Sequence, residues 1–192
     1  MLALVVATTE DLGLVDRARA GDDAAFGELV SEHEKTVLRT AWRLVGNAED
    51  ARDIAQEVFF RLHHNLGRLD PERGLGAWLY RVTVNLALTA LRRRKRRPES
   101  SLEGSERVAA GANGKPEQER RSDAADARRL LAPVLEKLSD KERAAVILRD
   151  LEGLDMKDVA KALGCRQVTV RSYLSRGRLK LRNAVTGAGG PS

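Results

Sequence analysis

The sequence predicts an all-α protein of two small helical domains joined by a flexible linker, and three observations predict it. Apolar residues recur at helical spacing along most of the 192 residues. No alternating pattern typical of strands persists anywhere, and one stretch rich in Pro, Gly and Ser separates two helical regions. We expect a first domain over residues 10–97, a linker over 98–121, a second domain over 122–184 and a disordered tail over 185–192.

The first domain is expected to hold four helices, each bounded by a capping or turn residue. They are expected over about residues 10–20, 23–46, 48–66 and 77–97. Asp22 or Asp23 would cap the second helix, and Gly46 would end it. The third has an acidic outer face with carboxylates at i, i+4 spacing, and the fourth ends in six consecutive cations, Arg92 to Arg97, before Pro98.

Helices resume near Asp123, after a linker that offers little apolar surface to bury. Ser139 and Glu142 have the spacing of a capping box, which predicts another helix start. From Leu151 to Arg182 the chain then reads as two helices about a turn at Gly164. This pattern resembles a helix-turn-helix, whose second helix enters the major groove of DNA.

The second helix of that pair is densely basic. Its apolar side is expected to comprise Val168, Val170 and Leu174. Six cations and no acidic residue lie between Arg166 and Arg182, so duplex DNA is the expected target, with a merely solvated basic face as the alternative. Charge supports DNA: residues 1–90 hold 10 basic and 14 acidic residues, whereas residues 91–192 hold 24 and 14.

Other classes of protein are disfavoured by composition. One cysteine, Cys165, excludes an internal disulfide, and His63 and His64 are expected to project apart, so no metal site and no cofactor are expected. Cys165 is expected to be structural, with redox sensing as the alternative. The apolar start MLALVVA lacks the features of a signal peptide or membrane anchor, which predicts a cytoplasmic protein with no membrane insertion.

Three segments in this order resemble a bacterial sigma factor of the extracytoplasmic function (ECF) type, in the sigma-70 family. DARDIAQEVFFRL (50–62) resembles region 2.2 of that family, and GAWLYRVTVNLALTALRRRKR (76–96) resembles regions 2.3 and 2.4. Residues 138–182 resemble region 4. The resemblance implies a region 2 helical bundle and a region 4 helix-turn-helix. It also implies promoter-specific initiation of transcription with core RNA polymerase and promoter DNA as partners, no catalysis, and an anti-sigma factor as a further partner.

The resemblance also implies roles for individual residues. Region 2.2 would dock on core polymerase through Asp53, Gln56, Glu57 and Arg61; an acidic solvated face is the alternative for its carboxylates. The fourth helix would read and open the minus-ten element through Arg81, Asn85, Thr89, Arg92 and Arg93, with Asn85 bonding a base edge. Thr89 stands where the family often has an acidic residue. Trp78 and Tyr80 could stack on bases, although core positions are the alternative.

Region 4 would read the minus-35 element through its basic helix, by the residues Arg166, Gln167, Thr169, Arg171, Ser172, Tyr173, Arg176 and Arg178. Three departures from the family pattern occur here. Arg166 replaces a usual serine cap, Tyr173 replaces a frequent arginine, and Gly177 interrupts the helix at a cost of about 1 kcal/mol relative to alanine.

One alternative function belongs to a different class: an autonomous helix-turn-helix repressor or activator that binds duplex DNA without polymerase. Such a protein would read two half-sites as a symmetric dimer. It would have no reason to combine the region 2.2 segment with Asn85 and an arginine run. A nucleic-acid enzyme is disfavoured, because no nucleophile constellation or phosphate-cradling glycine loop is recognisable.

Overall fold

The computed structural model describes residues 9–69, 74–96 and 134–187, and within these ranges it contains helices and no strand. The predicted all-α class is therefore confirmed. The helices are α1 (Thr9–Arg19), α2 (Asp23–Val45), α3 (Ala48–Asn65), the 3-10 turn η1 (Leu66–Arg68), α4 (Leu75–Arg96), α6 (Asp140–Val146), the π-helical turn η3 (Ile147–Leu151), α7 (Met156–Leu163) and α8 (Gln167–Gly187).

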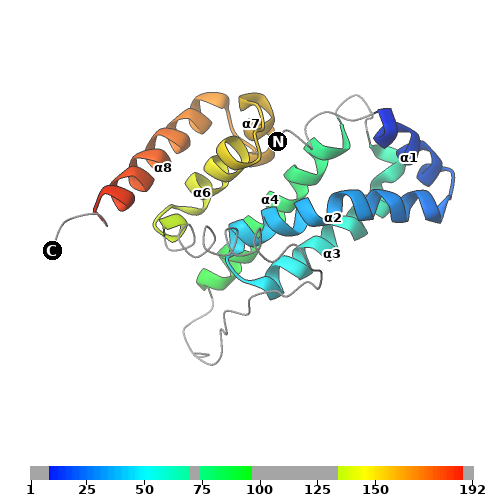
Figure 1. Ribbon diagram of the computed structural model, residues 1–192, viewed down its shortest axis with the longest axis horizontal. Coiled ribbons are helices and arrows are strands. Elements are labelled where there is room, and N and C mark those ends of the chain that lie inside the picture. Colours follow the sequence, from blue (N-terminus) through cyan, green and yellow to red (C-terminus); the bar gives the residue numbers. More distant parts are fainter. Residues whose placement is uncertain (1–8, 70–73, 97–133, 188–192) are drawn as a thin grey trace, which may run out of the picture.

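Helices α1 to α4 form a bundle in which α2 contacts the other three (Figure 1). Leu29, Leu44, Leu62 and Leu79 are fully buried in it. Its helix starts follow local capping chemistry. The Asp22 carboxylate accepts from the backbone N–H of residue 25, so the first of the two candidate aspartates is the cap of α2.

Helices α6, α7 and α8 form the second unit. The predicted capping box is confirmed: Ser139 and Glu142 satisfy each other's backbone N–H groups at the start of α6. Gly164 ends α7 in a left-handed conformation, φ +61°, which turns the chain into α8. α8 continues to Gly187, past the predicted boundary at 184. The start expected near 123 lies outside the described residues.

Gly177 allows α8 to pack closely against α6, a role that its low helix propensity does not suggest. A Cβ at this position would lie 2.9 Å from Cγ2 of Val146 and 3.6 Å from the backbone oxygen of Glu142. Both neighbours belong to α6. The missing side chain therefore lets α8 approach α6 more closely than any other residue would allow.

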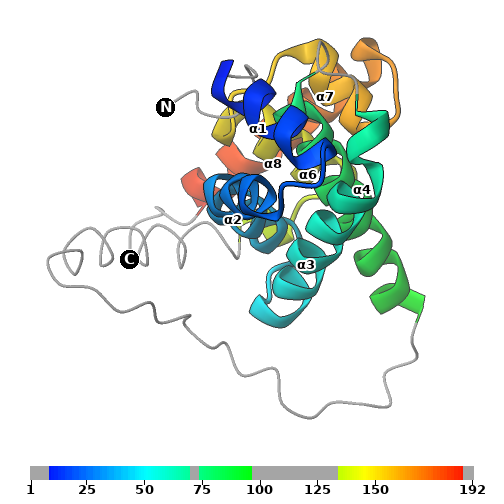
Figure 2. The same ribbon diagram turned by 90° about the vertical axis from the view of Figure 1, so that its right-hand side faces the viewer.

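The two units are packed together rather than separate. α7 lies against α4, and α6 contacts both α2 and α4. Figure 1 shows α6, α7 and α8 to one side of the α1–α4 bundle with α8 outermost, and in the end-on view of Figure 2 α6 and α8 lie behind α1 and α2. The helix that resembles the minus-ten reader is thus a direct neighbour of the helix-turn-helix.

Candidate nucleic-acid interface

One polar ridge runs along the outer side of α4. Arg81, Asn85 and Arg92 are exposed and Thr89 is half-buried, and their spacing of three or four residues places them on one face. The Thr89 hydroxyl donates to the backbone oxygen of Asn85 at 2.7 Å, and Arg92 donates to that hydroxyl at 3.2 Å. The Asn85 side-chain amide bonds to no other described residue, so both its donor and its acceptor face solvent.

The cationic end of α4 is similarly available. Arg93 is exposed and forms no ion pair with any residue in the described ranges, and the same holds for Arg94 and Arg96. Lys95 differs, because its ammonium pairs with Asp140 of the second unit at 2.8 Å. The ridge and this end together form a continuous polar and positive surface, which suits a sugar-phosphate backbone.

Two aromatic residues near the start of α4 have different environments. Trp78 is half-buried and packs against the core of the bundle. Tyr80 is 4% exposed, and its hydroxyl donates to Glu152 at 3.1 Å. Burial and the neighbouring Glu152 carboxylate raise the pKa of Tyr80 well above its ordinary value. In this arrangement Tyr80 is a core residue rather than a stacking platform.

The expected minus-35 readers lie on several sides of α8 and its N-terminal turn. Arg166, Gln167 and Ser172 are exposed near the start of α8, where a helix-turn-helix presents residues to base edges. Arg171 and Arg178 line a groove of about 710 Å³. Thr169 and Tyr173 are half-buried, and Arg176 lies with its guanidinium 5.5 Å from the Tyr173 ring centroid.

That groove is cationic with an apolar floor. Its lining consists of Arg149, Met156, Arg171, Leu174, Ser175, Arg178, Leu179 and Arg182. Arg149 comes from η3, more than twenty residues before the others on α8, so periodicity along α8 does not reveal that it joins them. Its Nη1 donates to the backbone oxygen of Leu154 at 2.6 Å, which holds the guanidinium at the edge of the groove.

Carboxylates of the same unit already engage three of the α8 cations. Arg178 makes a two-pronged pair with Asp150 at 2.6 and 3.0 Å, which raises the pKa of the arginine. Lys180 pairs with Glu142 at 2.7 Å, and Arg176 pairs with the same residue at 3.4 Å. These ion pairs orient the cations but also compete with phosphate for them.

The prediction that Val168 belongs to the core is wrong. Its side chain is 57% exposed, whereas Val170 is fully buried and Leu174 is 5% exposed. Successive helical residues are rotated by about 100°, so Val168 lies on the side of α8 opposite to the other two. An exposed valine therefore stands among the polar residues of the first turn of the helix.

The polymerase-docking face proposed for α3 is accessible. Asp53, Gln56 and Arg61 are exposed, and the Arg61 guanidinium donates to the Glu57 carboxylate at 2.7 Å. Phe60 is 59% exposed on the same stretch, a residue that the sequence analysis did not single out. Phe59 is in helical phase with the buried Ala55 and Leu62, whereas Phe60 is not, and this phase was the available signal.

Phe60 is part of a small group of ring contacts that includes the neighbouring histidines. The His64 imidazole lies over it with ring centroids 4.2 Å apart, and the His63 and His64 rings lie 5.6 Å apart. These two histidines were expected to project apart, and that expectation is wrong. His63 also packs edge-on against Phe26 of α2 at 5.0 Å, and His64 Nδ1 lies 2.9 Å from the backbone oxygen of Phe60.

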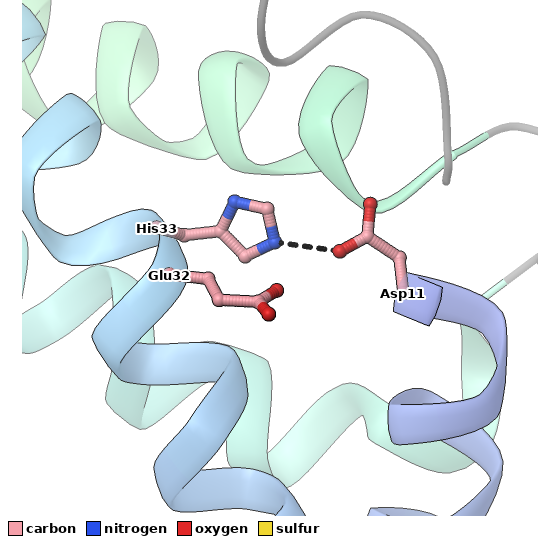
Figure 3. A group of neighbouring side chains, drawn as sticks. All are labelled: Asp11, Glu32 and His33. Atoms are coloured by element: carbon pink, nitrogen blue, oxygen red, sulfur yellow. Dashed lines mark hydrogen bonds and ion pairs between the residues drawn. The ribbon is translucent and has the colours of Figure 1, made fainter. Parts of the chain in front are cut away.

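A second group of titratable side chains joins α1 to α2. Asp11, Glu32 and His33 bring one possible ligand atom each within 4.8 Å of one another, a grouping that sequence spacing did not predict. Figure 3 shows that Nε2 of His33 faces Asp11, at 3.1 Å, while the other ring nitrogen points away from Glu32. With Asp11 and His33 both buried, the arrangement is that of an interhelical hydrogen bond.

No helix in the described ranges is long and apolar enough to cross a membrane. Models of two families match the chain: sigma-70 region 2 over residues 29–97 and sigma-70 region 4 over residues 128–181. These matches include α4 with most of the bundle, and α6 to α8 as far as residue 181.

Similar proteins carry the same family name. The chain is 41% identical over 167 residues to the ECF RNA polymerase sigma factor SigE of Mycolicibacterium smegmatis, covering 85% of this chain and 63% of that protein. It is 32% identical to the RNA polymerase sigma-H factor of Pseudomonas aeruginosa, covering 92% and 94%.

A solved structure shares the fold. It is that of the sigma factor RpoE in complex with the anti-sigma factor NepR from Bartonella quintana, with a TM-score of 0.65, 22% identity, and coverage of 84% of this chain and 96% of that one. Together with the helix-turn-helix, the polar ridge of α4 and the two family matches, these likenesses identify the chain as a member of the ECF group of sigma-70 family sigma factors.

Proposed function

We propose that this sigma factor directs core RNA polymerase to its promoters by reading minus-ten DNA with α4 and minus-35 DNA with α8. The observation that carries the proposal is the pairing, in one chain, of an accessible Asn85 ridge with a basic helix-turn-helix. In this role the protein binds and positions DNA but performs no catalysis, and it acts in the cytoplasm beside polymerase.

At the minus-ten element, Asn85 would hold an unstacked base by its edge. Unstacking a base costs a few kcal/mol, and a protein without ATP must offset this cost by binding the exposed base and its strand. Arg81, Arg92 and Arg93 would follow the phosphates along the same face. Thr89 would act through Arg92, because its hydroxyl orients that guanidinium.

At the minus-35 element, the first turns of α8 would read duplex DNA. Gln167, Arg171 and Ser172 are exposed there, with Arg166 just before the helix. Arg178, in the groove beside Arg171, would bind backbone phosphate. Arg176 pairs with Glu142 of α6, and helical spacing puts Thr169 and Tyr173 on the same face of α8. These three residues would contact the edge of the DNA major groove.

Core polymerase would dock on α3 through Asp53, Gln56, Glu57 and Arg61. The exposed Phe60 adds an aromatic side chain to this face, and interface hot spots are enriched in large side chains ringed by polar ones. Charges of this kind raise the association rate and set register more than affinity. An anti-sigma factor is the further partner we propose, as in the RpoE complex with NepR.

Reconstitution with purified core polymerase tests the function. Transcription should start at a selected promoter only when the chain is added. Charge reversal at Asp53 and Glu57 should weaken binding of core polymerase and leave the secondary structure content unchanged, with Asp16→Lys and Glu28→Lys as the control for net charge. Tight protection of a palindromic duplex without polymerase, and no initiation with it, would instead establish the autonomous regulator.

A further inference from the structure

One buried carboxylate of the second unit is held entirely by the first. Glu152 follows η3, and its side chain is 3% exposed. It accepts hydrogen bonds from four side chains of α2 and α4: Arg39 at 3.3 Å, Thr40 at 3.3 Å, Arg43 at 2.5 Å and Tyr80 at 3.1 Å. Both carboxylate oxygens are used, each by one arginine and one hydroxyl.

This set of two guanidinium groups and two hydroxyl groups suits a carboxylate, which offers two negatively charged oxygens to accept from them. A buried carboxylate is stable only when it is paired and hydrogen-bonded, and here two guanidinium groups supply the charge. Thr40 is fully buried and Tyr80 nearly so, so their hydroxyl groups are directed inward at a fixed position. The four residues form a prepared anion site on the first unit.

Other polar contacts cross the same boundary. Arg143 of α6 donates to the backbone oxygen of Leu44 in α2 at 2.9 Å. Lys95 of α4 pairs with Asp140 of α6 at 2.8 Å. Together with the packing of α7 on α4, these contacts hold the second unit against the bundle in a closed arrangement.

The closed arrangement is too short for a promoter. α7 packs against both α4 and α8, so at this junction these two helices lie no more than about two helix diameters, or ~20 Å, apart. Sites named minus-ten and minus-35 are separated by about 25 base pairs, or ~85 Å at about 3.4 Å per pair.

We propose that Glu152, seated in the Arg39–Thr40–Arg43–Tyr80 site, is a latch that keeps the free sigma factor closed and must be released before both promoter elements are bound. The proposal rests on the proposed function. If only the open form binds, the apparent affinity is the affinity of the open form multiplied by the fraction of molecules that are open. The latch keeps that fraction small and therefore lowers the affinity of the free chain for polymerase and promoter.

Glu152→Gln tests the latch in the full chain, since it keeps the shape of the side chain and removes the charge that two arginines need. Spin labels on Cys165, at the turn of the helix-turn-helix, and on Ser31→Cys, exposed on α2, report the separation of the units. The variant should show a broad population at longer distance that the parent lacks. Tyr80→Phe, which removes one donor, should show a smaller population of the same kind.

Asp150→Asn is the matched control. Asp150 lies two residues away and is also a paired carboxylate, but its partner, Arg178, belongs to its own unit. The inter-label distance should therefore be unchanged in this variant. Thermal melts of all variants report whether each unit remains folded. If Glu152→Gln unfolds, the double variant Arg39→Gln with Arg43→Gln tests the latch instead, because it removes the two cations of the site from the first unit.

The functional readout is binding to core polymerase and promoter. Released chain should bind with about tenfold higher apparent affinity. An unchanged inter-label distance in Glu152→Gln and in the arginine variant overturns the latch, whether or not the chain supports transcription. An opened chain with lower affinity would show that the contact serves the active form instead. If the variants open as expected but the parent fails to initiate transcription with core polymerase, the result would count against the proposed function alone.

Discussion

Helices α4 and α8 both present cations to solvent, but carboxylates engage a larger share of the cations on α8. On α4, the exposed Arg93 and Arg94 bond to no carboxylate in the described ranges, and Lys95 alone of the cationic end is paired, with Asp140. On α8, Arg176, Arg178 and Lys180 are each paired with a carboxylate of the same unit, whereas Arg171 and Arg182 form no ion pair within the described ranges. Arginines without a carboxylate partner are free to follow a strand of variable path, whereas paired ones hold a defined geometry.

The difference matches the two forms of DNA that we propose they bind. A single strand has no fixed shape, so a row of free cations beside one base-reading amide is sufficient. Duplex DNA is regular, and a helix that must fit its groove benefits from side chains already oriented. The cost is competition, because each internal carboxylate must give way before its cation reaches a phosphate.

The largest effect is expected from Asn85→Ala, which removes the one amide on the α4 ridge. Promoter opening, followed by permanganate reactivity of unpaired thymines, should fall by tenfold or more, because the flipped base loses its edge contact. Initial duplex binding should change little. Asn183→Ala makes the same chemical change on an exposed site at the end of α8 and should preserve opening; equal losses of binding and opening in Asn85→Ala would contradict its role.

A second test removes the packing that positions the α8 cations. Gly177→Ala places a methyl 2.9 Å from Val146, between Arg176 and the Lys180–Glu142 pair. The free energy of unfolding should fall by about 1–3 kcal/mol, although alanine is the better helix former. Denaturant unfolding of the full chain measures it.

The matched control for that substitution is Gly27→Ala in α2, where a Cβ meets no atom within 4 Å. This change should stabilise by up to about 1 kcal/mol, through helix propensity alone. Adding Val146→Ala to Gly177→Ala should restore part of the loss. Equal stabilisation by both glycine substitutions would show that the close approach of α8 to α6 is unimportant.

Releasing one cation of α8 from its carboxylate should raise affinity for minus-35 duplex DNA a few fold. Asp150→Asn releases Arg178 from its two-pronged pair, so affinity for minus-35 duplex should rise about two- to fivefold, as expected for exposed ion pairs worth below ~1 kcal/mol. The dependence of log affinity on log salt should steepen by up to about one. Asp16→Asn, which removes the Arg19–Asp16 ion pair of α1 instead, should change neither quantity.

The smallest expected effect is on the free energy of unfolding at acidic pH, through the carboxyl group of Glu142. Burial raises the pKa of Glu142, but hydrogen bonds from Lys180 and from Ser139 outweigh it, so the pKa lies below its ordinary 4.5. Its stabilising contribution is present above pH 4.5 and is lost as pH falls through the lower folded value. The difference in unfolding free energy between the parent and Glu142→Gln should therefore narrow below pH 4.5. A constant difference would refute the assignment.

Features that depend on near neighbours in the chain were predictable. The Ser139–Glu142 box and the turn at Gly164 rest on contacts within a few residues, so spacing alone predicts them. The acidic stretch of α3 and the Asn85 ridge also follow from helical periodicity. Val168 was misplaced because a helix with cations on two sides leaves the direction of its core open to more than one interpretation.

The sequence by itself determined the helical class, the two basic helices and the family, because these are carried by local patterns and by motifs in order. Only the tertiary structure decided which cations are free, why Gly177 is a glycine, and that Glu152 enters a site made by α2 and α4. Each of these depends on residues far apart in the chain, more than a hundred positions in the case of Arg39 and Glu152. Periodicity specifies which face of a helix is buried, but only packing specifies what that face meets.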